Sequence, residues 1–296
     1  MITPVYRQGD KGDRGVSSVA EARRSFSEEL ERIAKDVVRL GSMTAETIPR
    51  GTEVLLKGDL LLAQQLIDED DEIDALAVEI EDHCYHVLAL QQPMAGDMRA
   101  IVTAIRLSSE FERDADLMVN VCKAARRLFG VDLPPTVRRY IEEMAEEALR
   151  LTRLAVEAYA NRDESVAAAL DDIDDRLDEL HADYIQAVFE AHQRSEIDLP
   201  SAVQLALVGR YYERIGDHAV NVGERIRYMV SGWLPEHTGM ARMRLRSDST
   251  AGSLAGRPAS ETGDGESGSA ADDGSPGLPS LDTGTDDPPS ETSSNS

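Results

Sequence analysis

The sequence is poor in the residues that hold disulfide-rich domains and β-rich folds together. It contains two cysteines and 4% aromatic residues in 296. Two cysteines without a C-x-x-C spacing exclude a disulfide framework, so we expect Cys84 and Cys122 to be reduced thiols in a helical core. The low aromatic content, together with abundant Ala, Leu, Glu, Asp and Arg, favours helices over strands.

Long hydrophobic runs are also missing. No stretch of about 18 uncharged apolar residues is present, which excludes a transmembrane helix of ordinary length. The first residues lack the order of charged, apolar and small residues that marks a signal peptide. We therefore expect a cytoplasmic protein, bound to the inner face of the membrane only through partners.

Basic residues are outnumbered by acidic ones. Lys and Arg total 31 against 56 Asp and Glu, a formal net charge of −25. This balance argues against nucleic-acid binding, which needs clustered basic residues to neutralise phosphates. The termini contribute no periodic pattern: residues 1–20 are a mixture of Gly and charged residues, and residues 236–296 are rich in Gly, Ser, Asp, Pro and Thr. We predict that both are disordered, the second as an acidic tail.

Between these ends, apolar residues recur at steps of three and four, as at Val37, Leu40 and Met43. This period predicts long amphipathic helices. Gly and Pro between the periodic segments mark the breaks. The expected helices are 21–57, 59–90, 96–129, 134–161, 163–195 and 199–231. Short connections make successive helices antiparallel. The predicted fold class is therefore all-α, with one three-helix bundle in 21–130 and a second in 131–235.

An internal repeat supports two related halves. Glu112-Arg113-Asp114-Ala115-Asp116 and Glu213-Arg214-Ile215-Gly216-Asp217 match at a shift of 101 residues (213 − 112), and each continues to an Asn-Val pair at Asn120 and Asn221. A period this long exceeds the 20–50 residues of a solenoid unit. We interpret it as the duplication of a domain half. Asp97 and Asp198 match at the same shift and are predicted to cap their helices.

The repeat also contains paired acids. The shift of 101 maps Asp70 and Asp74 onto Asp171 and Asp175. Residues four apart lie on one face of a helix, so each pair presents two carboxylates side by side. Carboxylates that face one another recruit cations or protons. Oxygen ligands suit Mg²⁺, Mn²⁺, Ca²⁺ or iron, and the amides of Asn120 and Asn221 are predicted helpers.

Other functions fit the same acids. A carboxylate-bridged metalloenzyme is one alternative, but the chain has no Glu-x-x-His, no phosphate-binding glycine loop and no H-E-x-x-H pair. A structural adaptor whose acids only face solvent is another. We expect no enzyme activity. Arg113 and Arg214 are expected to pair with acids, and His218 is expected at the surface because it points about 100° away from Asp217.

The sequence resembles the PhoU family of phosphate-signalling regulators. The resemblance covers residues 21–231 in order. It is carried by both repeats, Glu112-Arg113-x-x-Asp116 and Glu213-Arg214-Ile215-Gly216-Asp217-His218, by Gln92-Pro93 followed by Asp97-Met98-Arg99, and by Phe26-x-x-Glu29-Leu30.

This resemblance implies a metal-binding adaptor. The family's E(D)-x-x-x-D motifs bind metal clusters, with iron or zinc suggested. The metal residues implied here are Asp70, Asp74, Glu112, Asp116, Asp171, Asp175, Glu213 and Asp217. The resemblance further implies a homodimer that represses phosphate uptake and the phosphate-starvation response, by coupling the ATPase subunit of a phosphate ABC transporter to a membrane sensor histidine kinase.

Overall fold

The computed structural model describes residues 12–91 and 93–232. These residues form six helices. The helices are α1 (Gly12–Lys57), α2 (Leu60–Leu90), α3 (Ala95–Arg127), α4 (Pro135–Asn161), α5 (Glu164–Gln193) and α6 (Leu199–Ser231). The described part of the chain contains no strand, so the predicted all-α class is confirmed.

The boundaries agree with the sequence pattern except at the start. The first helix was expected at residue 21, but α1 begins at Gly12, where disorder was predicted. The added residues 12–19 contain two glycines and two valines, so local helix propensity does not account for this extension. The rest of the predicted N-terminal segment, 1–11, and the predicted acidic tail, 236–296, lie outside the described residues.

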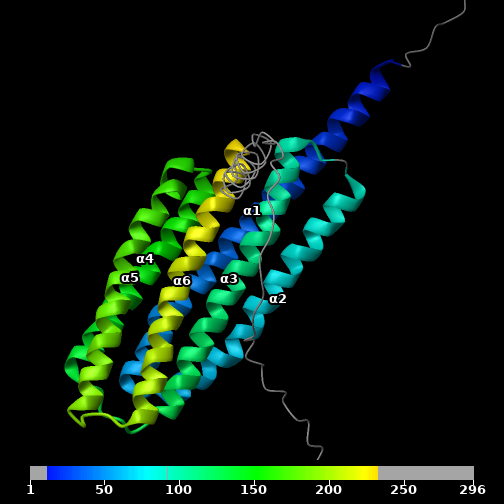
Figure 1. Ribbon diagram of the computed structural model, residues 1–296. Coiled ribbons are helices and arrows are strands. Elements are labelled where there is room, and N and C mark those ends of the chain that lie inside the picture. The colour runs from blue at the N-terminus through cyan, green and yellow to red at the C-terminus, as the bar shows by residue number, and fades with distance from the viewer. Residues whose placement is uncertain (1–11, 92, 233–296) are drawn as a thin grey trace, which may run out of the picture. The chain divides into compact units, whose positions relative to one another are not determined.

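The six helices form two three-helix halves that pack side by side (Figure 1). In the first half α2 packs on α1 and α3, and in the second half α5 packs on α4 and α6. The two halves meet where α1 contacts α4 and where α3 contacts α6. The helices that carry the repeated motif, α3 and α6, therefore lie next to each other, and each also faces the acid-bearing helix of its own half, α2 or α5.

Equivalent turns begin α2 and α5. Gly58, with φ of +67°, and Arg162, with φ of +52°, adopt the left-handed conformation that ends the preceding helices. Asp59 then accepts hydrogen bonds from the backbone N–H groups of Leu61 and Leu62 at 3.1 and 3.0 Å. Asp163 caps α5 in the same way. These caps fix where the two helices start.

The predicted caps of α3 and α6 have different outcomes. The Asp198 carboxylate accepts a hydrogen bond from the Ser201 N–H at 2.9 Å and caps α6, as predicted. The prediction for Asp97 is wrong, because Met94 is the N-cap residue of α3 and makes no side-chain cap bond. Asp97 lies inside the first turn, where its charge still interacts favourably with the helix dipole.

The core is continuous across both halves. Leu40 and Ile48 of α1, Phe111 of α3 and Ile215 of α6 are buried in one cluster. Polar groups inside it are paired: the Thr52 and Tyr212 hydroxyls share a hydrogen bond of 2.7 Å between α1 and α6. Both cysteines are buried free thiols, as expected. Burial raises the pKa of Cys84 to about 12 and that of Cys122 to about 11, which favours the protonated thiol over the thiolate.

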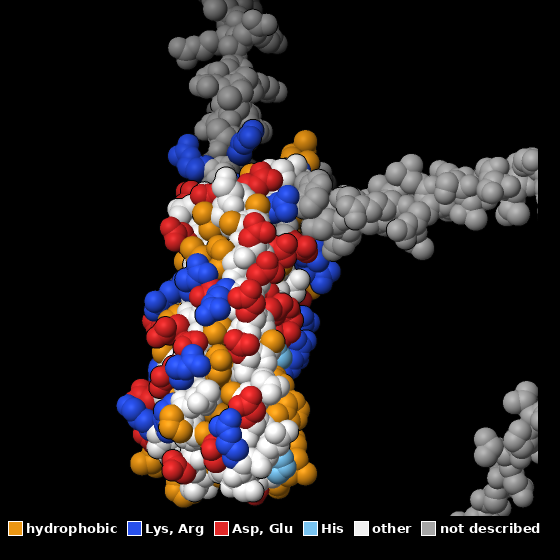
Figure 2. All heavy atoms as spheres, turned by 60° about the vertical axis from the view of Figure 1, so that its left-hand side comes forward, with side chains coloured by type: hydrophobic (Ala, Val, Ile, Leu, Met, Phe, Trp, Pro, Cys, Tyr) orange, Lys and Arg blue, Asp and Glu red, His pale blue; other side chains and the backbone are white. Residues whose placement is uncertain are grey.

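The surface view shows acidic and basic side chains interspersed, with no continuous basic patch on this face (Figure 2). None of the helices in the described residues is long and apolar enough to cross a membrane.

Candidate functional site: two acidic clusters

The first acidic cluster consists of Asp70 and Asp74 on α2 with Glu112 and Asp116 on α3. Burial raises the pKa of Asp70 to about 7, with further contributions from the charges of the other three acids. The pKa of Glu112 is raised by burial and then by Asp116 and Asp74. Because the charges of Asp74, Glu112 and Asp116 all act on Asp70, the structure places the four residues predicted for the first half in one neighbourhood between α2 and α3.

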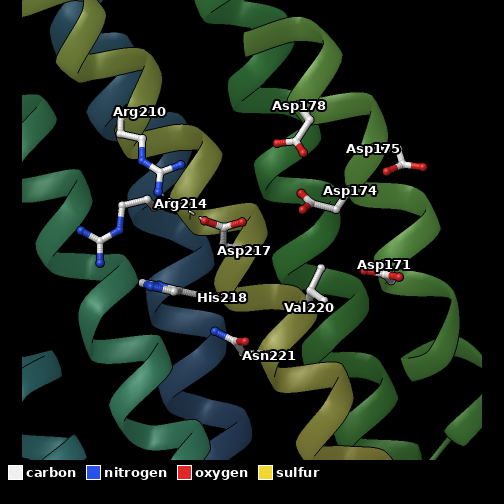
Figure 3. A pocket seen from close by; sticks show the side chains of 10 residues that line it. All are labelled: Asp171, Asp174, Asp175, Asp178, Arg210, Arg214, Asp217, His218, Val220 and Asn221. Atoms are coloured by element: carbon white, nitrogen blue, oxygen red, sulfur yellow. Dashed lines mark ion pairs between the residues drawn. The ribbon is translucent and has the colours of Figure 1, made fainter. Parts of the chain in front are cut away.

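The second acidic cluster lies between α5 and α6. We define it as Asp174, Asp178, Glu213 and Asp217. Three of these, Asp174, Asp178 and Asp217, line a pocket of about 640 Å³ together with Arg210 and Arg214 (Figure 3). Burial raises the pKa of Asp174 to about 7, and the charges of Asp178 and Asp217 raise it further. Asp174 and Asp178 were not among the residues singled out from the sequence.

The α5 acids predicted from the shift of 101 lie at the margin of this pocket. Asp171 and Asp175 are exposed residues of its lining, and Asp175 points away from α6 (Figure 3). Asp174, at 8% exposure, is the acid that points toward α6. The predicted register on α5 therefore differs from the structure by three residues.

The helix caps explain the difference. Asp70 and Asp74 follow the α2 cap, Asp59, by 11 and 15 residues, and Asp174 and Asp178 follow the α5 cap, Asp163, by the same intervals (70 − 59 and 174 − 163). Between α2 and α5 the structural shift is thus 104 residues, against the shift of 101 that relates the repeated motifs on α3 and α6. The paired caps were the sequence signal that would have identified Asp174 and Asp178.

The predicted amide helpers differ in position. Asn221 lines the pocket of the second cluster. Asn120 is half-buried on α3, one turn beyond Asp116.

Glycine at position 216 lets α5 approach α6. A Cβ atom on Gly216 would lie 2.1 Å from Asp174 Oδ1 and 2.7 Å from Leu177 Cδ2. Both distances are below any van der Waals contact, so only the absence of a side chain allows the Asp174 carboxyl to sit against the α6 backbone. The first half has Ala115 at the corresponding position, so this close approach is a property of the second cluster.

His218 is buried at the junction of the two halves, so the expectation of a surface position is wrong. Its Nδ1 atom lies 2.6 Å from Asp114 Oδ1, and its Nε2 atom lies 4.0 Å from Glu110 Oε2, both on α3. The side chain does point away from Asp217, but toward α3 and not toward solvent. Asp114, the additional acid within the first motif, likewise faces the other half and not the first cluster.

Charge explains the stability of this buried pair. Burial lowers the pKa of His218, but the hydrogen bond to Asp114 and its charge outweigh burial, so the pKa is raised overall. Burial raises the pKa of Asp114 to about 7 despite the opposing effect of His218. Both shifts favour a proton on this pair, because burial disfavours the Asp114 anion and the Asp114 charge in turn favours the His218 cation.

The acids fit a metal ion in donor chemistry. Each cluster offers several carboxylates from two facing helices, and Asp174 Oδ1 is buried without a hydrogen-bond partner among the described residues. Within residues 12–91 and 93–232, however, no three His, Cys, Asp or Glu side chains are placed closely enough to form a ready-made metal site. Like charges repel one another in the absence of a cation, so binding requires the carboxylates to converge.

Two tandem three-helix bundles, each with an acidic cluster between its second and third helix, define a class of duplicated helical proteins. A family model of the PhoU domain matches residues 37–125 and 141–226, one match in each half. The chain belongs to the PhoU family. The resemblance found in the sequence is thereby confirmed, and the two matches correspond to the two predicted repeats. This is a family of accessory and regulatory proteins and not of enzymes, as expected for this chain.

Relatives and solved structures agree with this assignment. The chain is 34% identical over 214 residues, 72% of its length and 96% of the relative's, to the phosphate-specific transport system accessory protein PhoU homolog 1 of Mycobacterium tuberculosis. It is 33% identical to homolog 2 of the same organism, covering 72% of this chain and 100% of that protein. The crystal structure of PhoU from Pseudomonas aeruginosa matches in fold with a TM-score of 0.67, at 24% identity over 70% of this chain and 100% of the other.

Proposed function

We propose that this protein is a negative regulator of phosphate uptake and of the phosphate-starvation response. In this role it is a cytoplasmic, homodimeric adaptor that binds metal through its acidic clusters and contacts the ATPase subunit of a phosphate ABC transporter and a sensor histidine kinase. The observation that carries the proposal is the match of both halves to the PhoU domain, because the matching relatives are named accessory proteins of phosphate-specific transport.

The metal component rests on the clusters themselves. Asp70, Asp74, Glu112 and Asp116 would hold the metal in the first half. In the second half Asp174, Asp178 and Asp217 line the pocket. Glu213, beside them on α6, would complete this set, and the sequence-predicted Asp171 and Asp175 would add negative charge at the margin of the pocket. A bound metal would neutralise the charge between two helices of each half, and thereby fix the distance between them.

The first experiment measures metal content by plasma mass spectrometry of the full chain after gel filtration. The unmodified protein is compared with a variant that carries Asp70→Asn, Asp116→Asn, Asp174→Asn and Asp217→Asn. We expect stoichiometric metal in the unmodified protein and its loss in the folded variant. The matched control, Asp68→Asn with Asp172→Asn, changes exposed carboxylates on the same two helices and should retain metal. A metal-free unmodified protein under metal-replete conditions would reject the metal component.

The adaptor component has a separate test. Deletion of the gene should derepress phosphate-starvation genes in phosphate-rich medium, and the full chain should capture the transporter's ATPase subunit from a reconstituted mixture. Unchanged expression after deletion would contradict the regulatory role, whatever the metal content is. If the metal-free variant still captures the ATPase subunit, the contact depends on the protein surface alone, as expected for an adaptor without metal.

A further inference from the structure

The two acidic clusters differ in one basic side chain. In the second cluster Arg210, one turn before Glu213 on α6, forms an ion pair with Glu213 and lies 3.7 Å from Asp217 Oδ2. Its guanidinium also lines the pocket (Figure 3). Arg210 is thus a positive charge, attached to the chain, that reaches two of the four carboxylates.

The first cluster has serine at the corresponding position. At the motif shift of 101, Ser109 on α3 is the residue that corresponds to Arg210 on α6 (210 − 101). Ser109 lines a cavity of about 310 Å³ with Asp74 and Glu112, so the same position borders the carboxylates in both halves. Arg113, the nearest arginine on α3, pairs with Glu110 at 3.8 Å instead. Two cations act on the first cluster without forming an ion pair with its acids: Lys123 is the smallest contribution to the pKa of Asp70, and Arg113 is the smallest contribution to the pKa of Glu112.

The second cluster nevertheless has a group that points to a ligand. Asp174 is 8% exposed, and its Oδ1 atom has no hydrogen-bond partner among the described residues. It lines the same pocket as Arg210, but the arginine pairs with the α6 acids and not with Asp174. The guanidinium therefore pairs by charge with the two α6 carboxylates, although Glu213 Oε2, like Asp174 Oδ1, has no hydrogen bond among the described residues.

From this difference we propose that Arg210 is a built-in counter-cation that competes with metal at the second cluster and makes the two halves unequal in affinity. The inference rests on the proposed function, because it assigns the tighter metal site to the first half. A metal ion that enters the second cluster must displace the guanidinium from Glu213 and Asp217, whereas a metal at the first cluster meets no such competitor. The first cluster consequently binds metal at a lower metal concentration than the second cluster does.

The experiment measures Mn²⁺ binding by isothermal titration calorimetry on the full chain, with one cluster disabled at a time. In the background Asp70→Asn with Asp116→Asn, only the second cluster binds, and Arg210→Ser should tighten its dissociation constant about tenfold, the size of effect of one nearby unit charge on a divalent ion. In the background Asp174→Asn with Asp217→Asn, Ser109→Arg should weaken the first cluster by a similar factor. The control Arg194→Ser removes an arginine paired with Glu190 elsewhere on the surface and should change neither constant.

A readout without metal separates this proposal from the proposed function. In metal-free protein at pH 7.5, Arg210→Ser should lower the melting temperature more than Arg194→Ser, because the carboxylates lose their counter-cation. If no variant binds Mn²⁺ but this difference persists, the metal function fails and Arg210 keeps only its neutralising role, which refutes the competition. If Mn²⁺ binds and Arg210→Ser leaves the constant unchanged or weakens it, the metal function stands and the role proposed for Arg210 is overturned.

Discussion

His218 shows how one residue connects the two halves. It follows Asp217 directly in the sequence, yet it belongs to the junction between α3 and α6 and not to the second acidic cluster. At that junction it is the only described cationic partner in hydrogen-bond distance of the buried Asp114. Removing one partner of a buried pair leaves the other without compensation, which costs more than the pair contributes.

We therefore predict that His218→Ala lowers the free energy of unfolding by about 3 kcal/mol at pH 8. At pH 5 the loss should be smaller, because the isolated Asp114 carboxyl takes up a proton and becomes neutral. Urea unfolding at both pH values measures the difference. The control is His83→Ala, whose ring pairs with Glu29 in a partly exposed position and should cost less than about 1 kcal/mol. Equal losses for the two variants at pH 8 would refute the buried-pair interpretation.

Gly216 provides a second prediction at this scale. Replacing glycine by alanine inside a helix normally stabilises it by about 1 kcal/mol. At Gly216 the added Cβ would collide with Asp174 and Leu177, so Gly216→Ala should instead destabilise the protein by about 1–3 kcal/mol. Gly96→Ala, where no atom lies within 4 Å of the added Cβ, should be neutral or stabilising. Urea unfolding of both variants decides the sign, and a stabilising Gly216→Ala would show that α5 does not approach α6 this closely.

At the scale of elements, the helix caps determine which acids face one another. Asp59 and Asp163 start α2 and α5, and the acids that face α3 and α6 follow each cap at equal intervals. The stretch from the cap to the motif glutamate is 53 residues in the first half (112 − 59) and 50 in the second (213 − 163). The helix starts lie 35 residues apart in both halves (95 − 60 and 199 − 164), so the motif glutamate is three residues nearer the start of α6 than that of α3.

The caps should also contribute to stability. We predict that Asp59→Ala and Asp163→Ala each lower the free energy of unfolding by about 1 kcal/mol, because each leaves backbone N–H groups of the first turn without an acceptor. Asp97→Ala, which removes no cap bond, should stay within about 0.5 kcal/mol of the unmodified protein. Thermal or urea unfolding measures all three. A loss at Asp97 equal to that at Asp59 would indicate that helix-dipole effects, and not capping, dominate.

The sequence predicts the helices well, but it predicts less well which residues of neighbouring helices face one another. Helix boundaries were predictable because Gly58, Asp163 and Asp198 act locally, within a turn or two of the chain. The first cluster was predictable as well, because its four acids belong to one half and form two pairs with the i, i+4 spacing of one helix face. The α5 acids of the second cluster were assigned three residues too early because the motif shift of 101 was applied to α2 and α5, whose starts correspond at a shift of 104.

The position of His218 was unpredictable for another reason. Its direction relative to Asp217 follows from helix geometry, but what lies in that direction is set by the packing of α3 against α6. That contact joins residues 104 apart in the chain, and no local pattern encodes it.

For the whole molecule, the concentration of carboxylates makes metal-free stability depend on pH in an unusual direction. Asp70, Asp114 and Asp174 have pKa values raised from 3.8 to about 7. Between these values the folded state binds more protons than the unfolded state, so stability decreases as pH rises. The raised pKa of His218 acts in the same direction, since its contribution is lost as pH rises through the folded value. Below about pH 4 the lowered pKa of Asp198 reverses the trend.

We predict that the metal-free protein is more stable at pH 5.5 than at pH 8, by on the order of 2 kcal/mol once solvent screening of the half-buried Asp70 is considered. Urea unfolding in the presence of a chelator measures the difference. Asp70→Asn with Asp174→Asn should flatten the profile, because an amide binds no proton in this range. Mn²⁺ should restore stability at pH 8 and have little effect at pH 5.5, since protons and metal ions compete for the same carboxylates. If the free energy of unfolding of the metal-free protein instead increases toward pH 8, the clustered carboxylates are screened by solvent and do not destabilise the folded state.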